Sequence, residues 1–451
     1  MSKIAATVDI PSEDILFHPT SFCDEDGRVF WWNGELYRGI SARYAPLCQK
    51  LFDTGVVDSL IRSGFLIETE LTDLALPTYP LVLKHRALPF VTYASEWCPE
   101  MLREAAQFTL DMMRHLASDN LTVDVGTWDI LFEGCRPRYV DFCSIAAVST
   151  YDRHTWNGVL DDFLSYFVNP LTLMSQGKGN LARWLLLDYE HRVVHAELAA
   201  LMGQRIYGQR RPRGTHSIIR KLREKLADKL DSQRDPCRLN LIQKMQRSLN
   251  KIQLPPPAFE PQAAFDSNKK SESLCQLLAT LQPATILDLG CGCGDRARVA
   301  AASGAQVIAI DRDDRQVARC YQTAKAQGLS ILPLVMDIRY PTAAQGTGKP
   351  VLAAAAERLQ CELVMALDIL HLLVFEQHLT LAQAVEAIAT FSTRWLIVEF
   401  STPAPALSRS DFRDSAFYNL QALLSLLQRQ FQDVSLIPLD HGNAPLILCK
   451  R

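Results

Sequence analysis

The amino-acid sequence predicts two successive parts of mixed α/β class: an α+β domain over residues 1–254, helical from about residue 155, and a doubly wound α/β domain over residues 255–451. The first observation behind this prediction is the run Pro255–Pro257, because consecutive prolines lack backbone donors and favour an extended connector. The second is the alternation of apolar strands with helices after that run, which is typical of a parallel sheet covered on both faces. The third is the mixture of short aromatic strands and a long amphipathic helix before it.

The composition is that of a folded globular chain. Its 451 residues are 48% hydrophobic and 22% charged, and the formal net charge of −3 exerts no general attraction toward nucleic acid or acidic lipid. No run approaches the roughly 18 apolar residues of a spanning helix, and the first residues lack the apolar core of a signal peptide, so we expect a cytoplasmic protein without membrane contact. The 12 cysteines show neither Cys-x-x-Cys spacing nor a histidine at zinc-finger distance, so we expect no metal and no disulfide framework.

Three elements can be predicted in the first 150 residues. The segment 29–38 is a hairpin, because aromatic, strand-favouring residues flank the turn Asn33-Gly34. The segment 99–117 is an amphipathic helix opened by a proline, with apolar residues at helical spacing. The segment 130–141 reads as two short strands around Gly134.

The helical region from about residue 155 to residue 250 contains a basic segment. Residues 205–251 carry 14 Lys and Arg against 4 Asp and Glu. Such an excess fits either a phosphate-rich partner or a solvated helical face above a narrow leucine stripe. Because no aromatic platform for bases is interleaved with the charges, we expect no binding of nucleic acid.

The C-terminal part alternates strands with helices. Strands are predicted over residues 285–289, 306–310, 331–336, 362–366 and 395–399, and helices over residues 296–303 and 315–327.

A glycine-rich turn connects the first of these strands to the first helix. Gly290, Gly292 and Gly294 alternate with other residues there, and glycines let a backbone turn sharply and approach a ligand closely. Asp288 lies two residues before the first glycine. Asp311 ends the second strand, where a carboxylate can accept hydrogen bonds from both hydroxyls of a ribose. This pattern predicts a Rossmann-like sheet with a nucleotide-type cofactor at its carboxyl edge.

The order Asp-x-Gly-x-Gly-x-Gly followed by Asp311 resembles class I S-adenosylmethionine-dependent methyltransferases, over about residues 265–451. The resemblance implies that S-adenosylmethionine is the cofactor and that Asp288 lies near its methionine end. It also implies that Asp337 lies beside the adenine amine and that the carbonyl of Ala366 faces the methionine amine. The alternative is a glycine turn in a Rossmann fold that binds no cofactor.

The sequence says less about the methyl acceptor than about the cofactor. The Asn/Asp-Pro-Pro-Tyr/Phe signature of enzymes that methylate exocyclic or amide nitrogens is missing after the fourth strand, as is a Pro-Cys nucleophile. Asp368 and His371 follow that strand instead and form a candidate catalytic pair, in which the imidazole removes a proton from the acceptor. The alternative is that His371 packs at a helix start. We expect O- or N-methylation of a small molecule or peptide.

The N-terminal part resembles the catalytic centre of the protein-kinase and aminoglycoside-phosphotransferase fold. Asp124 precedes Asp129 by five positions, as a catalytic aspartate precedes a metal-binding asparagine, and Asp141-Phe-Cys143 follows like Asp-Phe-Gly. Neither a glycine-rich phosphate loop nor the Val-Ala-Ile-Lys strand is recognisable. The resemblance implies a kinase-like domain without phosphotransfer, and the alternative is an unrelated α+β domain with carboxylates on loops.

Together the two parts resemble bacterial methyltransferases related to nodulation protein NoeA. The function expected from this resemblance is methyl transfer. The alternative is a scaffold protein whose kinase-like half and basic segment hold a phosphate-rich partner. The oligomeric state is left open.

Overall fold

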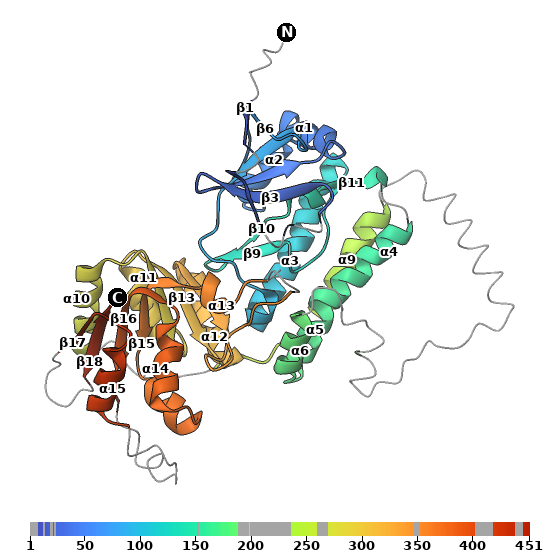
Figure 1. The fold of residues 1–451 in the computed structure, drawn as a ribbon. Helices are drawn as coiled ribbons and strands as arrows, with labels where there is room; N and C mark the ends of the chain where they lie inside the picture. Colours follow the sequence, from blue (N-terminus) through green and yellow to red (C-terminus); the bar gives the residue numbers. More distant parts are fainter. Residues whose placement is uncertain are drawn as a thin grey trace.

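The computed structural model contains the two predicted parts side by side (Figure 1). It describes residues 8–11, 14–18, 21, 24–150, 153–187, 198, 236–258, 269–346, 352–401, 418–437 and 445–451. The boundary at residue 254 stays a prediction, and most of the basic segment, residues 205–235, lies outside the described residues.

The N-terminal part begins with a five-stranded antiparallel sheet. In spatial order its strands are β2 (Leu16–Phe17), β3 (Gly27–Trp32), β4 (Glu35–Ile40), β7 (Leu81–His85) and β5 (Thr69–Leu71). The predicted hairpin is confirmed, since β3 pairs with β4 around Asn33 and Gly34, which have φ of 50° and 76°. Two left-handed residues in a two-residue loop match the right-handed twist of the strands. Helices α1 (Ala45–Asp53) and α2 (Val56–Arg62) follow β4.

Beneath this sheet lies a helical lobe with two small strand pairs. The central helix α3 (Pro99–Leu116) confirms the predicted amphipathic helix, and its buried face includes Leu102, Ala106, Leu110, Met113 and Leu116. The strands β9 (Ile130–Glu133) and β10 (Arg136–Tyr139) confirm the hairpin around Gly134. The other helices are α4 (Arg153–Phe163), α5 (Asn169–Ser175), α6 (Gly179–Leu186) and α9 (Pro236–Asn250); a π-helical turn, Leu164–Val168, joins α4 to α5. The remaining short strands are β1 (Val8–Asp9), β6 (Leu74–Ala75), β8 (Leu121–Thr122) and β11 (Ala146–Ala147).

The C-terminal part is a seven-stranded sheet. Its strands, in spatial order, are β14 (Ile331–Val335), β13 (Gln306–Asp311), β12 (Thr285–Leu289), β15 (Cys361–Ala366), β16 (Ser392–Glu399), β18 (Leu446–Lys450) and β17 (Asp433–Ile437). The first five are parallel, as predicted. The prediction of a wholly parallel sheet was incomplete, because β18 and β17 extend the sheet antiparallel to β16. The helices are α10 (Lys269–Leu281), α11 (Asp295–Ala302), α12 (Asp314–Gln327), α13 (Ala355–Arg358), α14 (Leu381–Ala389) and α15 (Leu420–Leu427).

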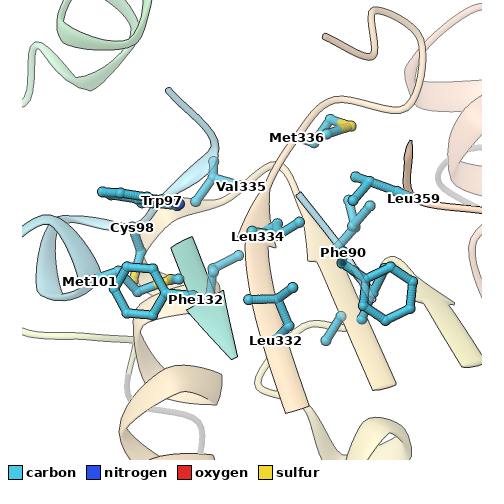
Figure 2. Close-up of a cluster of buried hydrophobic side chains, with 14 of the residues drawn as sticks. Phe90, Trp97, Cys98, Met101, Phe132, Leu332, Leu334, Val335, Met336 and Leu359 are labelled. Atoms are coloured by element: carbon cyan, nitrogen blue, oxygen red, sulfur yellow. The ribbon is translucent and has the colours of Figure 1, made fainter. Parts of the chain in front are cut away.

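The two parts share one hydrophobic core. Trp97, Met101 and Phe132 of the N-terminal part belong to the same buried cluster as Leu332 and Leu334 of the edge strand β14 (Figure 2). The rings of Trp97 and Phe132 pack edge to face with their centroids 4.9 Å apart. Helix α3 also packs against α12. The contact between the halves is therefore a packed interior rather than a loose surface contact.

The proline connector between the parts is fixed to the second of them. The backbone N–H of Ala258 donates to the carbonyl of Arg315 at 3.0 Å, and Arg315 Nε donates to the carbonyl of Pro256 at 3.2 Å. These bonds hold the connector against the start of α12.

Candidate active site

The glycine-rich turn adopts a conformation that few other residues could adopt. Gly290, Gly292 and Gly294 have φ of 71°, 53° and 89°, in the left-handed region that side chains disfavour. A Cβ atom on Gly290 would also lie 2.8 Å from Cδ1 of Ile369. The turn therefore depends on glycine both for its backbone angles and for its close contact with the loop after β15.

Asp311 fixes this turn from the end of the neighbouring strand β13. Its Oδ2 accepts a hydrogen bond from the backbone N–H of Gly292 at 3.0 Å, and its Oδ1 accepts one from Asp313 at 2.9 Å. Burial raises the pKa of this carboxyl, although the backbone donors act in the opposite direction. The glycine turn and the second strand thus meet at the carboxyl edge of the sheet, as the sequence pattern predicted.

Asp288 lies inside the protein beneath the turn, with no exposed surface. Neither of its carboxylate oxygens has a hydrogen-bond partner of ordinary geometry among the described residues. Burial raises the pKa of Asp288 to about 7, and the charge of Arg296 and the backbone N–H of Ala297 only partly offset this rise. A buried carboxylate that is so weakly compensated is costly, and a cationic or hydrogen-bonding ligand would stabilise its charged form.

These elements enclose a small cleft with a cavity of about 110 Å³. Four of the predicted site residues line it, namely Gly290, Asp311, Asp337 and Asp368. The other lining residues, which sequence reasoning did not single out, are Leu289, Ile310, Arg312, Met336, Ile338, Ile369, Leu372, Glu376 and Gln377. The other predicted site residues, Asp288, Gly292, Gly294, Ala366 and His371, are not among the lining residues.

Asp337, which the family resemblance places beside the adenine amine, forms an ion pair with Arg339. Both of its oxygens are engaged by Arg339, whose Nε lies 3.0 Å from Oδ1 and whose Nη2 lies 2.6 Å from Oδ2. Burial would raise the pKa of Asp337, but these bonds outweigh it and keep the pKa below the ordinary value. If an adenine amine also bound Asp337, the carboxylate would have to accept hydrogen bonds from both the amine and Arg339.

The loop after β15 brings together the residues proposed for acid–base chemistry. Asp368 has a left-handed φ of 58°, which is strained for a residue with a side chain. Arg296 holds the loop by donating to the carbonyl of Leu367 at 2.7 Å, and the hydroxyl of Ser401 lies 3.3 Å from Oδ1 of Asp368. The same hydroxyl lies 3.2 Å from Oε1 of the buried Glu399.

His371 lies one turn after Asp368. Its side chain is 13% exposed, and its Nδ1 lies 3.7 Å from Oδ1 of Asp368, beyond hydrogen-bonding distance. Nδ1 has no hydrogen-bond partner in the described part of the chain. The imidazole is thus close enough to be oriented by Asp368 after a small movement, and its role as a base stays a prediction.

An arginine that sequence reasoning did not single out lies beside Asp141, in the segment that resembles a kinase centre. Arg38 lies on β4, the third strand of the N-terminal sheet, where kinases place their phosphate-binding lysine. Its Nη1 lies 2.8 Å from Oδ1 of Asp141 and 3.3 Å from Oδ2 of Asp24. Burial, followed by the charges of Asp141 and Asp124, raises the pKa of Asp129 well above its ordinary value. The guanidinium thus engages one oxygen of the Asp141 carboxylate.

Two other features of the described residues bear on function. No group of three or more His, Cys, Asp or Glu side chains in these ranges is arranged to hold a metal ion. None of the helices described is both long enough and apolar enough to cross a bilayer.

Comparison with known proteins agrees with the arrangement at the glycine turn. Residues 286–367, which contain β12, the turn, Asp311 and β15, match the profile of a methyltransferase domain. The chain is also 26% identical over 449 residues to nodulation protein NoeA of Rhizobium meliloti (strain 1021), covering 93% of each protein.

Two solved structures are similar to about two fifths of the chain. One is the bifunctional kinase-methyltransferase WbdD, at 20% identity over 42% of this chain and 40% of that one, with a TM-score of 0.30. This chain thus spans less than half of the length of WbdD. The other is magnesium protoporphyrin IX methyltransferase from Synechocystis PCC 6803 with bound SAM, at 16% identity over 41% of this chain and 78% of that one, with a TM-score of 0.29. Residues 286–367, with the parallel sheet that carries them, are thus similar to a methyltransferase domain, and the chain as a whole is similar to NoeA over nearly its full length.

Proposed function

We propose that the protein transfers a methyl group from S-adenosylmethionine to an oxygen or nitrogen nucleophile on a small molecule or peptide. The observation that carries the proposal is Asp288, a buried and weakly compensated carboxylate next to a glycine turn that is fixed by a second carboxylate, Asp311. The cationic end of such a cofactor would compensate the charge of Asp288, and its ribose hydroxyls would donate further hydrogen bonds to Asp311.

The residues of the cleft fit such a cofactor in the following way. Asp311 would accept hydrogen bonds from the ribose hydroxyls at the tip of β13. Asp288 and the carbonyl of Ala366 would face the methionine end, and the Asp337–Arg339 pair would lie at the adenine end. When bound, S-adenosylmethionine supplies an electrophilic methyl group on its sulfonium. The protein's contribution would be to hold the acceptor in line with it, which accounts for a large part of the rate in reactions of this kind.

His371 is the residue that we propose to accept the acceptor's proton. An alcohol must lose its proton to become a good nucleophile, and a neutral imidazole can take it at cytosolic pH. Asp368, 3.7 Å from the imidazole, would orient the ring and stabilise the imidazolium once formed. The hydroxyl of Ser401 would keep Asp368 in place.

We further propose that the protein acts in the cytoplasm and that its N-terminal half carries out no phosphotransfer. The buried cysteines of the described residues are free thiols, which is typical of a reducing compartment. In the N-terminal half, Arg38 neutralises the carboxylate on which a metal-dependent phosphotransferase depends.

Calorimetry with S-adenosylmethionine tests the proposal. Wild-type protein should bind the cofactor, and Gly292→Trp should not, because the new side chain would fill the turn beside Asp311. Gly304→Trp is the matched control: Gly304 also has a left-handed φ, of 91°, but no atom lies within 4 Å of the position of its Cβ. Loss of binding in both variants would point to general backbone strain. Equal affinity in wild type and Gly292→Trp, or no binding to folded wild type, would contradict the assignment.

A further inference from the structure

A second cavity, outside the cleft at the glycine turn, lies between the two halves. It is a cavity of about 400 Å³ bounded by the N-terminal sheet, the loop before β9 and the segment before β15. Trp31, His85, Thr127 and Trp128 line it from the N-terminal half, and Ala353 and Arg358 line it from the C-terminal half. A molecule in this cavity would touch both halves at once.

The charged groups around the cavity neutralise one another. Arg38 pairs with Asp24 and Asp141 at 3.3 and 2.8 Å. Arg86 pairs with Glu68 and Glu133 at 2.5 and 2.8 Å. Arg358 pairs with the buried Glu96 and lies 4.0 Å from the centre of the Tyr93 ring.

Each arginine on the cavity wall is thus already engaged by a carboxylate. The remaining acid on the wall, Asp129, has its pKa raised well above the ordinary value by burial and by Asp141 and Asp124, which favours the uncharged form. Transfer of a polyanion or a hydrated metal ion into such a space would not be compensated by free charges.

Two buried polar groups on the wall are unsatisfied. His85 is 3% exposed, and its Nδ1 lies 2.9 Å from the hydroxyl of Thr69, which itself lies 3.0 Å from the carbonyl of Ile67. Because that hydroxyl has only one proton and the carbonyl requires it, Nδ1 of His85 carries the ring proton and Nε2 holds a lone pair. Neither this Nε2 nor the hydroxyl of Thr127, also 3% exposed, has a hydrogen-bond partner among the residues described.

The charge state of His85 is also set by its surroundings. Burial and the nearby charge of Arg38 lower the pKa of His85 to about 3, so the ring is neutral at physiological pH. A neutral buried acceptor requires a donor, and leaving it without one costs free energy.

The remaining wall is mostly aliphatic, and three aromatic side chains, Trp31, Tyr93 and Trp128, lie within it. The rings of Tyr93 and Trp128 pack together with their centroids 5.6 Å apart. Trp31 lines the cavity from strand β3 of the N-terminal sheet. Flat aromatic surfaces favour stacking with planar ligands.

We infer that this cavity binds an uncharged, planar heterocycle that donates an N–H or O–H hydrogen bond to Nε2 of His85, without a divalent cation. The ligand would stack on the aromatic side chains of the wall and exclude charged analogues of the same size. This site is separate from the cleft at the glycine turn, and its occupancy does not depend on the function proposed above.

Ligand-observed NMR titration of the full-length protein tests the inference with three matched probes: indazole, 1-methylindazole and indazole-3-carboxylate. Indazole should bind saturably with or without EDTA. Blocking its N–H as 1-methylindazole, or adding the carboxylate, should weaken binding at least threefold, and MgATP should not displace indazole. In His85→Phe the difference between indazole and 1-methylindazole should vanish.

A second pair of variants keeps the test valid if His85→Phe does not fold. Trp128→Ala removes part of the wall and should weaken indazole binding, whereas Trp184→Ala, at a residue that is 74% exposed and outside the cavity, should not. The inference is overturned if folded wild type does not bind indazole, if the methylated or charged probe binds equally well, or if MgATP competes.

Discussion

The carboxyl group of Asp288 makes stability depend on pH in an unusual direction. Its pKa is about 7 in the folded protein because of burial, against an ordinary value near 3.8. The folded state therefore binds a proton more tightly than the unfolded state, and the stabilisation is complete below about pH 4 and is lost as pH rises through about 7.

Asp288→Asn should remove this contribution. Between pH 5 and pH 8 the wild type should lose about 3 kcal/mol of its free energy of unfolding relative to Asp288→Asn, because about two pH units of the shift lie within that range. Urea denaturation of both proteins across that range measures it. A difference that stays constant with pH would show that Asp288 titrates normally.

His371 allows a test of catalysis against packing at a single residue. If the imidazole is the base, His371→Ala should lower kcat by roughly 10²–10⁴ and leave the affinity for S-adenosylmethionine unchanged. Asp368→Asn should show a smaller loss. Rate and melting curve are measured on one preparation, and a destabilised variant that retains its full rate per folded molecule would assign His371 to packing.

At the scale of elements, the hairpin of β9 and β10 joins the N-terminal part to the edge of the C-terminal sheet. A Cβ on Gly134 in its turn would lie 3.4 Å from the carbonyl of Ile331, and Cys135 Sγ donates to that carbonyl at 3.4 Å. Phe132, 1% exposed, inserts its ring beside Trp97. The hairpin thus covers an edge strand that would otherwise expose unpaired backbone groups.

Phe132→Ala should lower the free energy of unfolding by about 3–5 kcal/mol, because it leaves a cavity in the shared core. Denaturation followed by circular dichroism and by tryptophan fluorescence should give one coincident unfolding transition for each protein. In Phe132→Ala the whole transition should shift to a lower denaturant concentration than in the wild type. If only one of two separate transitions moves, the halves do not form the common core described above.

We expect the loops that carry Asp124, Asp129 and Asp141 to play no part in methyl transfer. Asp124→Asn and Asp129→Asn should leave the rate of methyl transfer largely intact. Asp141→Ala should lower the melting temperature, because Arg38 loses its closest partner, without changing the rate per folded molecule. MgATP at millimolar concentration should not raise the melting temperature; an increase that is lost in Asp141→Ala would indicate a working nucleotide site.

At the scale of the whole molecule, ion pairs connect the two halves, and the most deeply buried of those described is Arg358–Glu96. Arg358 of the C-terminal half and Glu96 of the N-terminal half are 6% and 1% exposed, and Arg358 also donates to the carbonyl of Val91 at 2.6 Å. Arg358→Ala should lower the free energy of unfolding by about 3–5 kcal/mol, since it leaves the Glu96 carboxylate buried without its partner.

Arg43→Ala is the matched control for that measurement. Arg43 also pairs with two carboxylates, but it is 65% exposed, so its removal should change stability little. If the two variants unfold at the same denaturant concentration, the pair between the halves does not stabilise the protein.

The sequence by itself determined the elements whose signals are local. The Asn33-Gly34 turn specifies its hairpin through left-handed backbone angles, and the apolar spacing within 99–117 specifies a helix with one buried face. The five parallel strands and the glycine turn with Asp288 and Asp311 were likewise predictable, because strand ends and glycine spacing lie within short stretches of chain.

Only the tertiary structure decided which distant residues meet. Arg38 and Asp141 are 103 positions apart, and Arg358 and Glu96 are 262 apart, so no local pattern marks either pair. The engagement of Asp337 by Arg339 depends on rotamers, and the placement of β17 and β18 depends on which sheet edge remains open after β16 is paired. Local propensity and periodicity fix elements, but ion pairs, shared cores and cavities depend on how those elements pack, and that information is distributed over the whole chain.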